Sequence, residues 1–205
     1  MKLSTYFNIC LEADYVRGED GASWAVEERE EELLILFEKS NGLTDWLNNF
    51  QFHAVPYREM NPVWQCHSGF LKVWKSAMPH LEGAVSEAVK KGKPITVVGY
   101  SHGAALAVLC HEWIWYHHPK ARKTLTGYGF GCPRVLYGCA TPTLARRWGR
   151  FYVVRNIDDA VTHLPPRIMG YCHVGNLITV GEHGRYTPLD AHRPESYQRE
   201  LGERR

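Results

Sequence analysis

A serine flanked by glycines lies near the middle of the chain, in the run Gly99-Tyr-Ser-His-Gly103. Apolar residues precede this run at 95–98, and mostly small or apolar residues follow it over 104–116, which predicts a strand leading into a helix. A serine on such a sharp turn has strained backbone angles, so the residues two before and two after it must lack bulk. The pattern therefore predicts a nucleophile elbow, with Ser101 beside a helix N-terminus that stabilises an oxyanion.

A nucleophilic serine needs a base to take its proton, and the base needs a carboxylate to hold its tautomer. Along the chain of an elbow protein, the acid follows the serine and the histidine follows the acid. Two adjacent acids, Asp158 and Asp159, come after an expected strand at 150–155. On spacing alone, either of them qualifies as the acid.

Four histidines lie beyond these acids. His163 is on the same loop as the acids and too near to close back easily, and His173 precedes an expected strand. His183 lies in a glycine-rich turn, and His192 comes directly before an expected final helix. Elbow proteins usually carry the base between the last strand and the last helix, so His192 is the first candidate and His183 the second.

The elements that must hold these residues alternate between strand and helix patterns. Apolar or β-branched runs predict strands at 33–37, 95–98, 125–130, 150–155 and 176–180, with further short strands at 6–11 and 23–26. Helical spacing predicts helices at 43–50, 71–77, from Pro79 to about residue 91, 104–116, 142–148 and 194–201. We expect Pro79 to interrupt the helical sequence that opens at 66–70, and 51–65 to be irregular.

This alternation predicts one domain over residues 1–205, an α/β fold with a mostly parallel sheet and helices on both faces. Chemistry in such sheets takes place at the carboxyl ends of strands. Ser101, the turn at Ser40 and the loop 156–166 all fall at such ends. We therefore expect them to share one rim of the sheet.

Composition argues against several other classes of protein. The 205 residues carry a net charge of +2 with scattered Lys and Arg, which offers no stripe for a nucleic-acid backbone. No segment approaches the roughly 20 apolar residues of a transmembrane helix, and the N-terminus lacks the apolar core of a signal peptide. We therefore expect a soluble, cytoplasmic chain whose six widely spaced cysteines are reduced.

One short run looks at first like the start of a zinc motif. His111-Glu112 opens like a helical His-Glu-x-x-His, but Trp115 occupies the place of the second histidine. We therefore expect no metal and no cofactor.

Further motifs extend along the chain in a fixed order. They are Phe37-Glu-Lys-Ser40 with Asp45-Trp-Leu47, His67-Ser-Gly-Phe70, the elbow, Phe130-Gly-Cys-Pro-Arg-Val135, Asn156-Ile-Asp-Asp-Ala-Val-Thr-His-Leu-Pro165, Gly170-Tyr-Cys-His173, and His192 five residues before Tyr197. The series spans 33–201 and resembles the class 3 (fungal-type) lipase and feruloyl esterase family. The resemblance implies the α/β-hydrolase fold.

The resemblance also implies an activity. It implies a carboxylic ester hydrolase that forms an acyl-serine intermediate on acylglycerols or other lipid esters, with Ser101 as nucleophile and His192 as base. It assigns the acid to Asp159 rather than to Asp158. The implied partners are a small-molecule or lipid ester and, transiently, a lipid interface, with no nucleic acid and no transmembrane segment.

Two further features of the site follow only from this resemblance. The oxyanion hole is implied to consist of the His102 backbone N–H and Ser40. The helix expected at 43–50 is implied to correspond to the family's lid.

Two other functions stay open on the sequence alone. An acyltransferase or a thioesterase uses the same scaffold, because an acyl-enzyme does not dictate its acceptor. A non-catalytic binding protein would account for Glu38-Lys39, where the family has Arg-Gly. The order Ser, Asp, His favours an enzyme, because a binding protein has no need to retain it.

Overall fold

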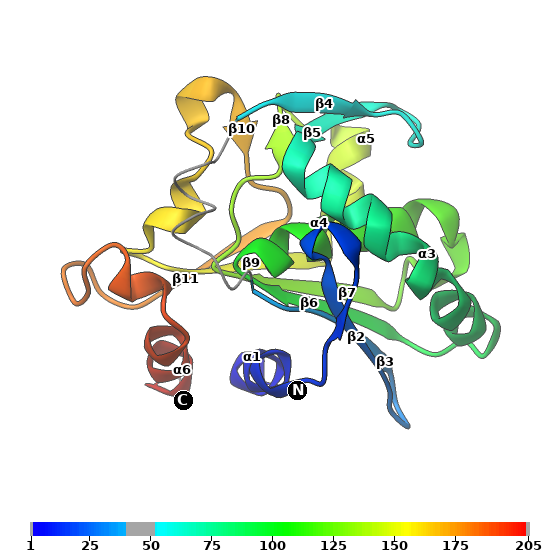
Figure 1. Cartoon of the computed structure of the whole chain (residues 1–205), viewed down its shortest axis with the longest axis horizontal. Helices are drawn as coiled ribbons and strands as arrows, with labels where there is room; N and C mark the ends of the chain where they lie inside the picture. Colours follow the sequence, from blue (N-terminus) through cyan, green and yellow to red (C-terminus); the bar gives the residue numbers. More distant parts are fainter. Residues whose placement is uncertain (1, 40–51, 204–205) are drawn as a thin grey trace.

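The computed structural model describes residues 2–39 and 52–203 (Figure 1). A seven-stranded main sheet has the order β1-β2-β3-β6-β7-β9-β11. Its strands are Val16–Arg17 (β1), Ser23–Glu28 (β2), Leu33–Phe37 (β3), Ile95–Tyr100 (β6), Leu125–Phe130 (β7), Phe151–Asn156 (β9) and Asn176–Val180 (β11). The five strands from β3 to β11 pair in parallel, whereas β1 and β2 pair antiparallel at one edge. The prediction of a mostly parallel sheet is confirmed.

The predicted strands at 23–26, 33–37, 95–98, 125–130, 150–155 and 176–180 are all present, with ends that differ by at most two residues. Every residue of β3 and β6 is buried. A parallel strand that is covered on both faces has an almost continuous apolar sequence, which is why the sequence predicted these strands.

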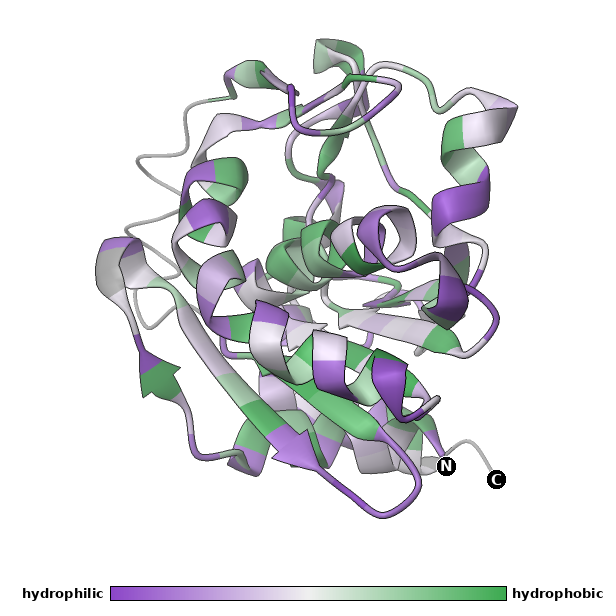
Figure 2. Ribbon diagram, turned by 90° about the vertical axis from the view of Figure 1, so that its right-hand side faces the viewer, coloured by the Kyte–Doolittle hydropathy of each residue, from purple (hydrophilic) through white to green (hydrophobic). Residues whose placement is uncertain are grey.

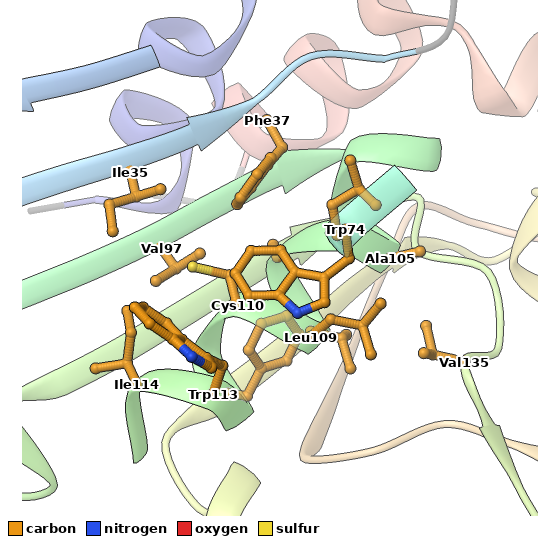
Figure 3. Close-up of a cluster of buried hydrophobic side chains, with 14 of the residues drawn as sticks. Ile35, Phe37, Trp74, Val97, Ala105, Leu109, Cys110, Trp113, Ile114 and Val135 are labelled. Carbon is orange, nitrogen blue, oxygen red and sulfur yellow. The ribbon is translucent and has the colours of Figure 1, made fainter. Parts of the chain in front are cut away.

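Helices cover both faces of the main sheet (Figure 1). The helices α1 (Leu3–Glu12) and α6 (Pro194–Glu203) pack together on one face, and α3 (Ser68–Lys90) and α4 (His102–His117) cover the other. Alternation along the strands divides the core, so that Leu36 and Val98 face α1 and α6 while Val97 faces α3 and α4. Figure 2 shows hydrophobic ribbon in the interior, and Figure 3 shows the core on the α3 and α4 side.

The helix α4 is buried along most of its length, since all residues from 102 to 114 are buried. It also carries ionisable side chains. Glu112 has no exposed surface and pairs with Arg147 of the short helix η3 (Arg146–Trp148). The side chain of Arg147 is also buried. Arg147 also donates to the carbonyl of Asn61. Removing one partner of such a pair is strongly destabilising, so the pair fixes how these segments pack.

A second, antiparallel sheet packs against α3 (Figure 1), and two of its strands, β4 and β5, begin within the stretch 51–65 that was predicted to be irregular. Its order is β10-β8-β5-β4, with β4 at Ala54–Tyr57, β5 at Trp64–His67, β8 at Leu136–Tyr137 and β10 at Tyr171–Cys172. The prediction for 51–65 is wrong, because strands of two to four residues give no periodic signal and β4 contains Pro56. Cys66 and His67 end β5 rather than opening a helix.

The predicted strand at 6–11 is wrong, because these residues belong to α1. Tyr6, Phe7 and Cys10 are buried there, and with Leu3 they have the spacing of one helix face. The aromatic residues favour strands in isolation. Packing against the sheet overrides that preference.

The predicted interruption at Pro79 is also wrong, because α3 continues through it. A proline inside a helix removes one backbone hydrogen bond. The buried stripe of α3 runs past it, from Phe70 through Ala77 and Leu81 to Ala88, so packing compensates for that loss.

Short helices fill the loops. They are η1 (Glu19–Gly21), η2 (Pro119–Ala121), α5 (Pro142–Ala145), η4 (Ala160–His163), η5 (Arg167–Met169) and η6 (Asp190–His192). Thr141 caps α5 by accepting from the Leu144 N–H, as its place before Pro142 predicted.

The predicted lid helix at 43–50 lies outside the described residues, and so does Ser40. Within the described residues, no helix combines the length and the hydropathy needed to cross a bilayer. All six cysteines are described and none is paired with another.

Candidate active site

Ser101 stands between β6 and α4 with a strained backbone, as the elbow pattern predicted. Its φ is 57° and its ψ is −123°, and it is the N-cap of α4. Such a conformation persists only where the surroundings enforce it. Here the Ser101 N–H donates to the carbonyl of Phe130 at 2.9 Å, which ties the turn to the neighbouring strand β7.

The two flanking glycines are required by space. A Cβ on Gly99 would lie 2.2 Å from the carbonyl oxygen of Gly103, and a Cβ on Gly103 would lie 2.3 Å from that of Phe37. Both distances are far inside van der Waals contact. Glycine therefore lets α4 start directly against the ends of β3 and β6.

The structure brings together three residues that are distant in sequence. The Ser101 Oγ lies 2.8 Å from Nε2 of His192, and Nδ1 of His192 lies 2.7 Å from Oδ2 of Asp159. All three side chains are buried. If Nδ1 carries the proton, Nε2 is free to accept one from the serine, which is the arrangement that a serine nucleophile needs.

Asp159 follows β9 and is held by three donors. Its Oδ1 accepts from the Val161 N–H at 2.9 Å, while Oδ2 accepts from His192 and from the hydroxyl of Tyr197 at 2.7 Å. The Tyr197 oxygen in turn accepts from the Asn156 N–H at 2.9 Å. These contacts orient the carboxylate toward the imidazole.

Tyr197 has a place in the site that the sequence did not reveal. The motif of His192 and a tyrosine five residues later includes Tyr197 but predicts no role for it. The tyrosine is fully buried on α6, and burial together with Asp159 raises its pKa well above the usual value. It therefore stays a neutral hydrogen-bond donor. The available signal was its position on the first turns of the helix that follows the base.

The other candidate residues lie elsewhere. Asp158 accepts from the Gly184 N–H and contacts the exposed imidazole of His183, so these two pair with each other instead of with Ser101. His173 contacts the carbonyl of Thr162 through Nε2 at 2.8 Å. The carbonyl of His163 accepts from Arg134.

His102 opens α4 directly after Ser101, so its backbone N–H lies at the positive end of the helix dipole. Burial, with a contribution from His67, lowers the pKa of its imidazole to about 4. The side chain is therefore neutral at physiological pH. Ser40, the other predicted oxyanion donor, lies outside the described residues.

Within the part of the chain that the structure describes, no three His, Cys, Asp or Glu side chains are grouped so that they would hold a metal ion. The chemistry that the site supports is nucleophilic attack by Ser101 with proton transfer to His192.

A parallel sheet that presents a serine elbow, followed in the chain by an acid and then a histidine, defines the α/β-hydrolases. The family model described as Lipase (class 3) matches residues 34–169. The chain therefore belongs to the class 3 lipase family, as the series of motifs predicted. His192 lies beyond the matched residues, so its position rests on the geometry above.

Curated relatives include secreted lipases. The chain is 29% identical over 158 residues to secreted mono- and diacylglycerol lipase 1 of Fusarium solani, a match that covers 75% of this chain and 45% of the relative. It is 28% identical over 158 residues to a lipase of Rhizomucor miehei, covering 71% and 41% respectively. The match thus spans less than half the length of these relatives.

A solved structure shows the same fold. The triacylglyceride lipase of Rhizomucor miehei superposes with a TM-score of 0.72 at 22% identity, covering 82% of this chain and 67% of that one. This confirms the predicted α/β-hydrolase fold.

Proposed function

We propose that the protein is a carboxylic ester hydrolase that works through an acyl-serine intermediate. One observation carries the proposal, namely the continuous contact from Ser101 through His192 to Asp159. A binding protein has no use for a base within hydrogen-bond reach of a strained serine. Membership of the class 3 lipase family supports the same activity.

In the acylation step, the Ser101 oxygen attacks the ester carbonyl carbon while Nε2 of His192 takes the hydroxyl proton. Asp159 stabilises the imidazolium that forms. The carbonyl oxygen becomes an oxyanion, for which the His102 N–H at the start of α4 is one donor and Ser40 is the second proposed donor. His192 then gives its proton to the leaving alcohol, and the acyl group stays on Ser101.

In the deacylation step, water replaces the alcohol. His192 takes a proton from the water as it attacks the acyl-serine, and then returns a proton to Ser101. Another acceptor in place of water would give an acyl transfer. Adding an alcohol or a thiol to the assay separates hydrolysis from transfer, because a transferase would form the acylated acceptor in place of the free acid.

We further propose acylglycerols or other lipid esters as the substrate class. The Fusarium relative is named a mono- and diacylglycerol lipase, which supports glycerol esters of fatty acids.

Lipid esters gather at interfaces, so we propose a transient contact with a lipid surface. An apolar patch of Tyr137, Ile168 and Met169 supports this partner. Ile168 is 96% exposed, Met169 44% and Tyr137 40%, so the described part of the chain leaves their apolar surface uncovered. A Cβ on Gly170, which caps η5, would lie 3.0 Å from the Tyr137 ring, so the end of η5 lies close to β8. Arg167, beside Ile168, adds a positive charge.

The cytoplasmic location predicted from the sequence differs from that of the Fusarium relative, which is named a secreted protein. The compartment therefore stays a prediction. Immunoblots of culture medium against cell lysate would decide it.

The proposed activity is tested with p-nitrophenyl esters from acetyl to palmitoyl, comparing the wild type with Ser101→Ala. We expect turnover by the wild type and a loss of at least about 10⁴-fold in the variant. The best acyl length would show whether the enzyme prefers lipids. Equal turnover by both proteins, each shown to be folded by circular dichroism, would contradict the proposal.

A further inference from the structure

The residue before the nucleophile, Tyr100, contacts the histidine that follows the nucleophile by 91 residues. Its hydroxyl donates to the backbone carbonyl of His192. Its ring also stacks on the imidazole, with centroids 5.4 Å apart and planes 25° apart. One side chain thus holds both the main chain and the ring of His192.

Tyr100 is itself held firmly. As the last residue of β6 it points, like Val98, toward the face covered by α1 and α6, and it is 2% exposed. Phe7 of α1 meets its ring edge-on at 5.3 Å, and Tyr197 does so at 5.9 Å. Burial and the nearby Asp159 raise its pKa, so the hydroxyl keeps its proton and remains a donor.

The imidazole meets a second boundary at Gly131, which follows β7. A Cβ there would lie 2.9 Å from Cε1 of His192 and 3.1 Å from Nδ1. Gly131 has a φ of 56°, a conformation that favours glycine. The ring of His192 therefore sits against the Tyr100 ring and close to the Gly131 backbone, with little freedom to turn.

We propose that Tyr100 is a positioning residue for the base: its hydroxyl anchors the main chain of His192, and its ring supports the imidazole. This inference rests on the proposed function, since His192 must act as the base. An aromatic face within about 6 Å also favours a cation, so the ring stabilises the imidazolium that forms when Ser101 gives up its proton.

The two contributions are separable. Tyr100→Phe keeps the ring and removes the hydroxyl, and we expect kcat to fall about 10-fold with KM unchanged, the size of one lost hydrogen bond. Tyr100→Leu removes both, and we expect the acid limb of the kcat/KM profile to move about half a pH unit lower as well.

A matched control is Tyr57→Phe. Tyr57 is also buried, and its hydroxyl accepts from Nε1 of Trp74 at 2.7 Å, in the second sheet rather than at the site. Both Phe variants lose one buried hydrogen bond, so their melting temperatures should fall by similar amounts. Only Tyr100→Phe should show the fall of about 10-fold in kcat.

A measurement without substrate keeps the inference distinct from the proposed function. The Nδ1 proton between His192 and Asp159 is sheltered, and in the wild type and Tyr57→Phe we expect it as a far-downfield proton NMR signal. In Tyr100→Phe we expect exchange with water to broaden or remove it. An unchanged signal together with unchanged kcat in Tyr100→Phe would overturn the inference. The two proposals can also fail separately. If Tyr100→Phe loses the signal but the wild type hydrolyses no ester, the positioning role is supported and the proposed function is contradicted.

Discussion

At the scale of single residues, local contacts fix the three side chains of the proposed triad. Ser101 is fixed by the strained turn between β6 and α4. Asp159 is fixed by three hydrogen-bond donors. His192 is fixed by the packing of its ring and by its contacts with the other two. These causes share the contacts of His192 with Ser101 and Asp159, so the three side chains hold one another in the folded chain without a bound substrate.

The choice between the adjacent acids gives a prediction with a built-in control. Asp159→Asn removes the charge that stabilises the imidazolium and favours the wrong tautomer of His192. We expect kcat on a short p-nitrophenyl ester to fall by about 10³–10⁴-fold. Asp158→Asn alters only a contact with the exposed His183 and the Gly184 N–H, and we expect a change within about twofold. Equal turnover by the two variants would refute the assignment.

The candidate site was largely predictable because its residues lie at the ends of strands or the starts of helices that the sequence indicates. The elbow needs glycine at fixed offsets, and Asp159 and His192 each follow a strand or precede a helix that the sequence indicates. Tyr197 and Tyr100 were not predicted as contacts, because packing between α6 and the sheet brings them to the site. Spacing along the chain carries no such information.

At the scale of elements, the parallel strands were predictable and the second sheet was not. Strands covered on both faces need long apolar runs, whereas β8 and β10 have two residues each. The prediction of a strand at 6–11 was wrong because the aromatic residues in this stretch favour strands in isolation. Its helical spacing of Leu3, Tyr6, Phe7 and Cys10 was the better signal.

The burial of α4 has a consequence for stability against pH. His111 is 1% exposed, its ring nitrogens have no hydrogen-bond partner, and burial lowers the pKa of its imidazole to about 3. The unfolded chain takes up a proton at His111 below about pH 6.5, but the folded chain does so only near pH 3. The unfolded state therefore binds more protons across this window, and stability falls as the pH falls.

The prediction is that His111→Leu flattens this dependence. Between pH 6.5 and 4.5 we expect the variant to lose about 2 kcal/mol less of its free energy of unfolding than the wild type. Urea unfolding at several pH values measures it, and Lys123→Leu, at an exposed position, is the control. A loss of the same size in wild type and His111→Leu would show that another group carries the effect.

At the scale of the whole molecule, the main sheet separates two packed faces, and Ser101 and Asp159 follow the carboxyl ends of its strands β6 and β9. From the face covered by α1 and α6 (Figure 1), Tyr197 of α6 donates to Asp159 and Phe7 of α1 packs on Tyr100, while on the other face α4 begins at Ser101. The apolar patch of Tyr137, Ile168 and Met169 lies outside both core clusters. Packing of the core therefore does not account for these three apolar side chains, which are free to contact a lipid surface.

The proposed lipid contact predicts a split between two kinds of substrate. Ile168→Asp with Met169→Asp places charge on the patch, and we expect turnover of an emulsified long-chain ester to fall about 10-fold or more. Turnover of a dissolved short ester should not change. Val16→Asp, which alters another exposed apolar residue on β1, is the control. Equal losses on both substrates would indicate a folding defect instead of a lost contact.

The central claim is that Ser101 is a nucleophile activated by His192. The most direct measurement is mass spectrometry of the protein after treatment with a fluorophosphonate, which a reactive serine attacks with loss of fluoride. We predict one adduct, on the peptide that contains Ser101, and none in Ser101→Ala or in His192→Ala on the same timescale. A folded wild type without an adduct, or an adduct elsewhere that persists in Ser101→Ala, would contradict the account.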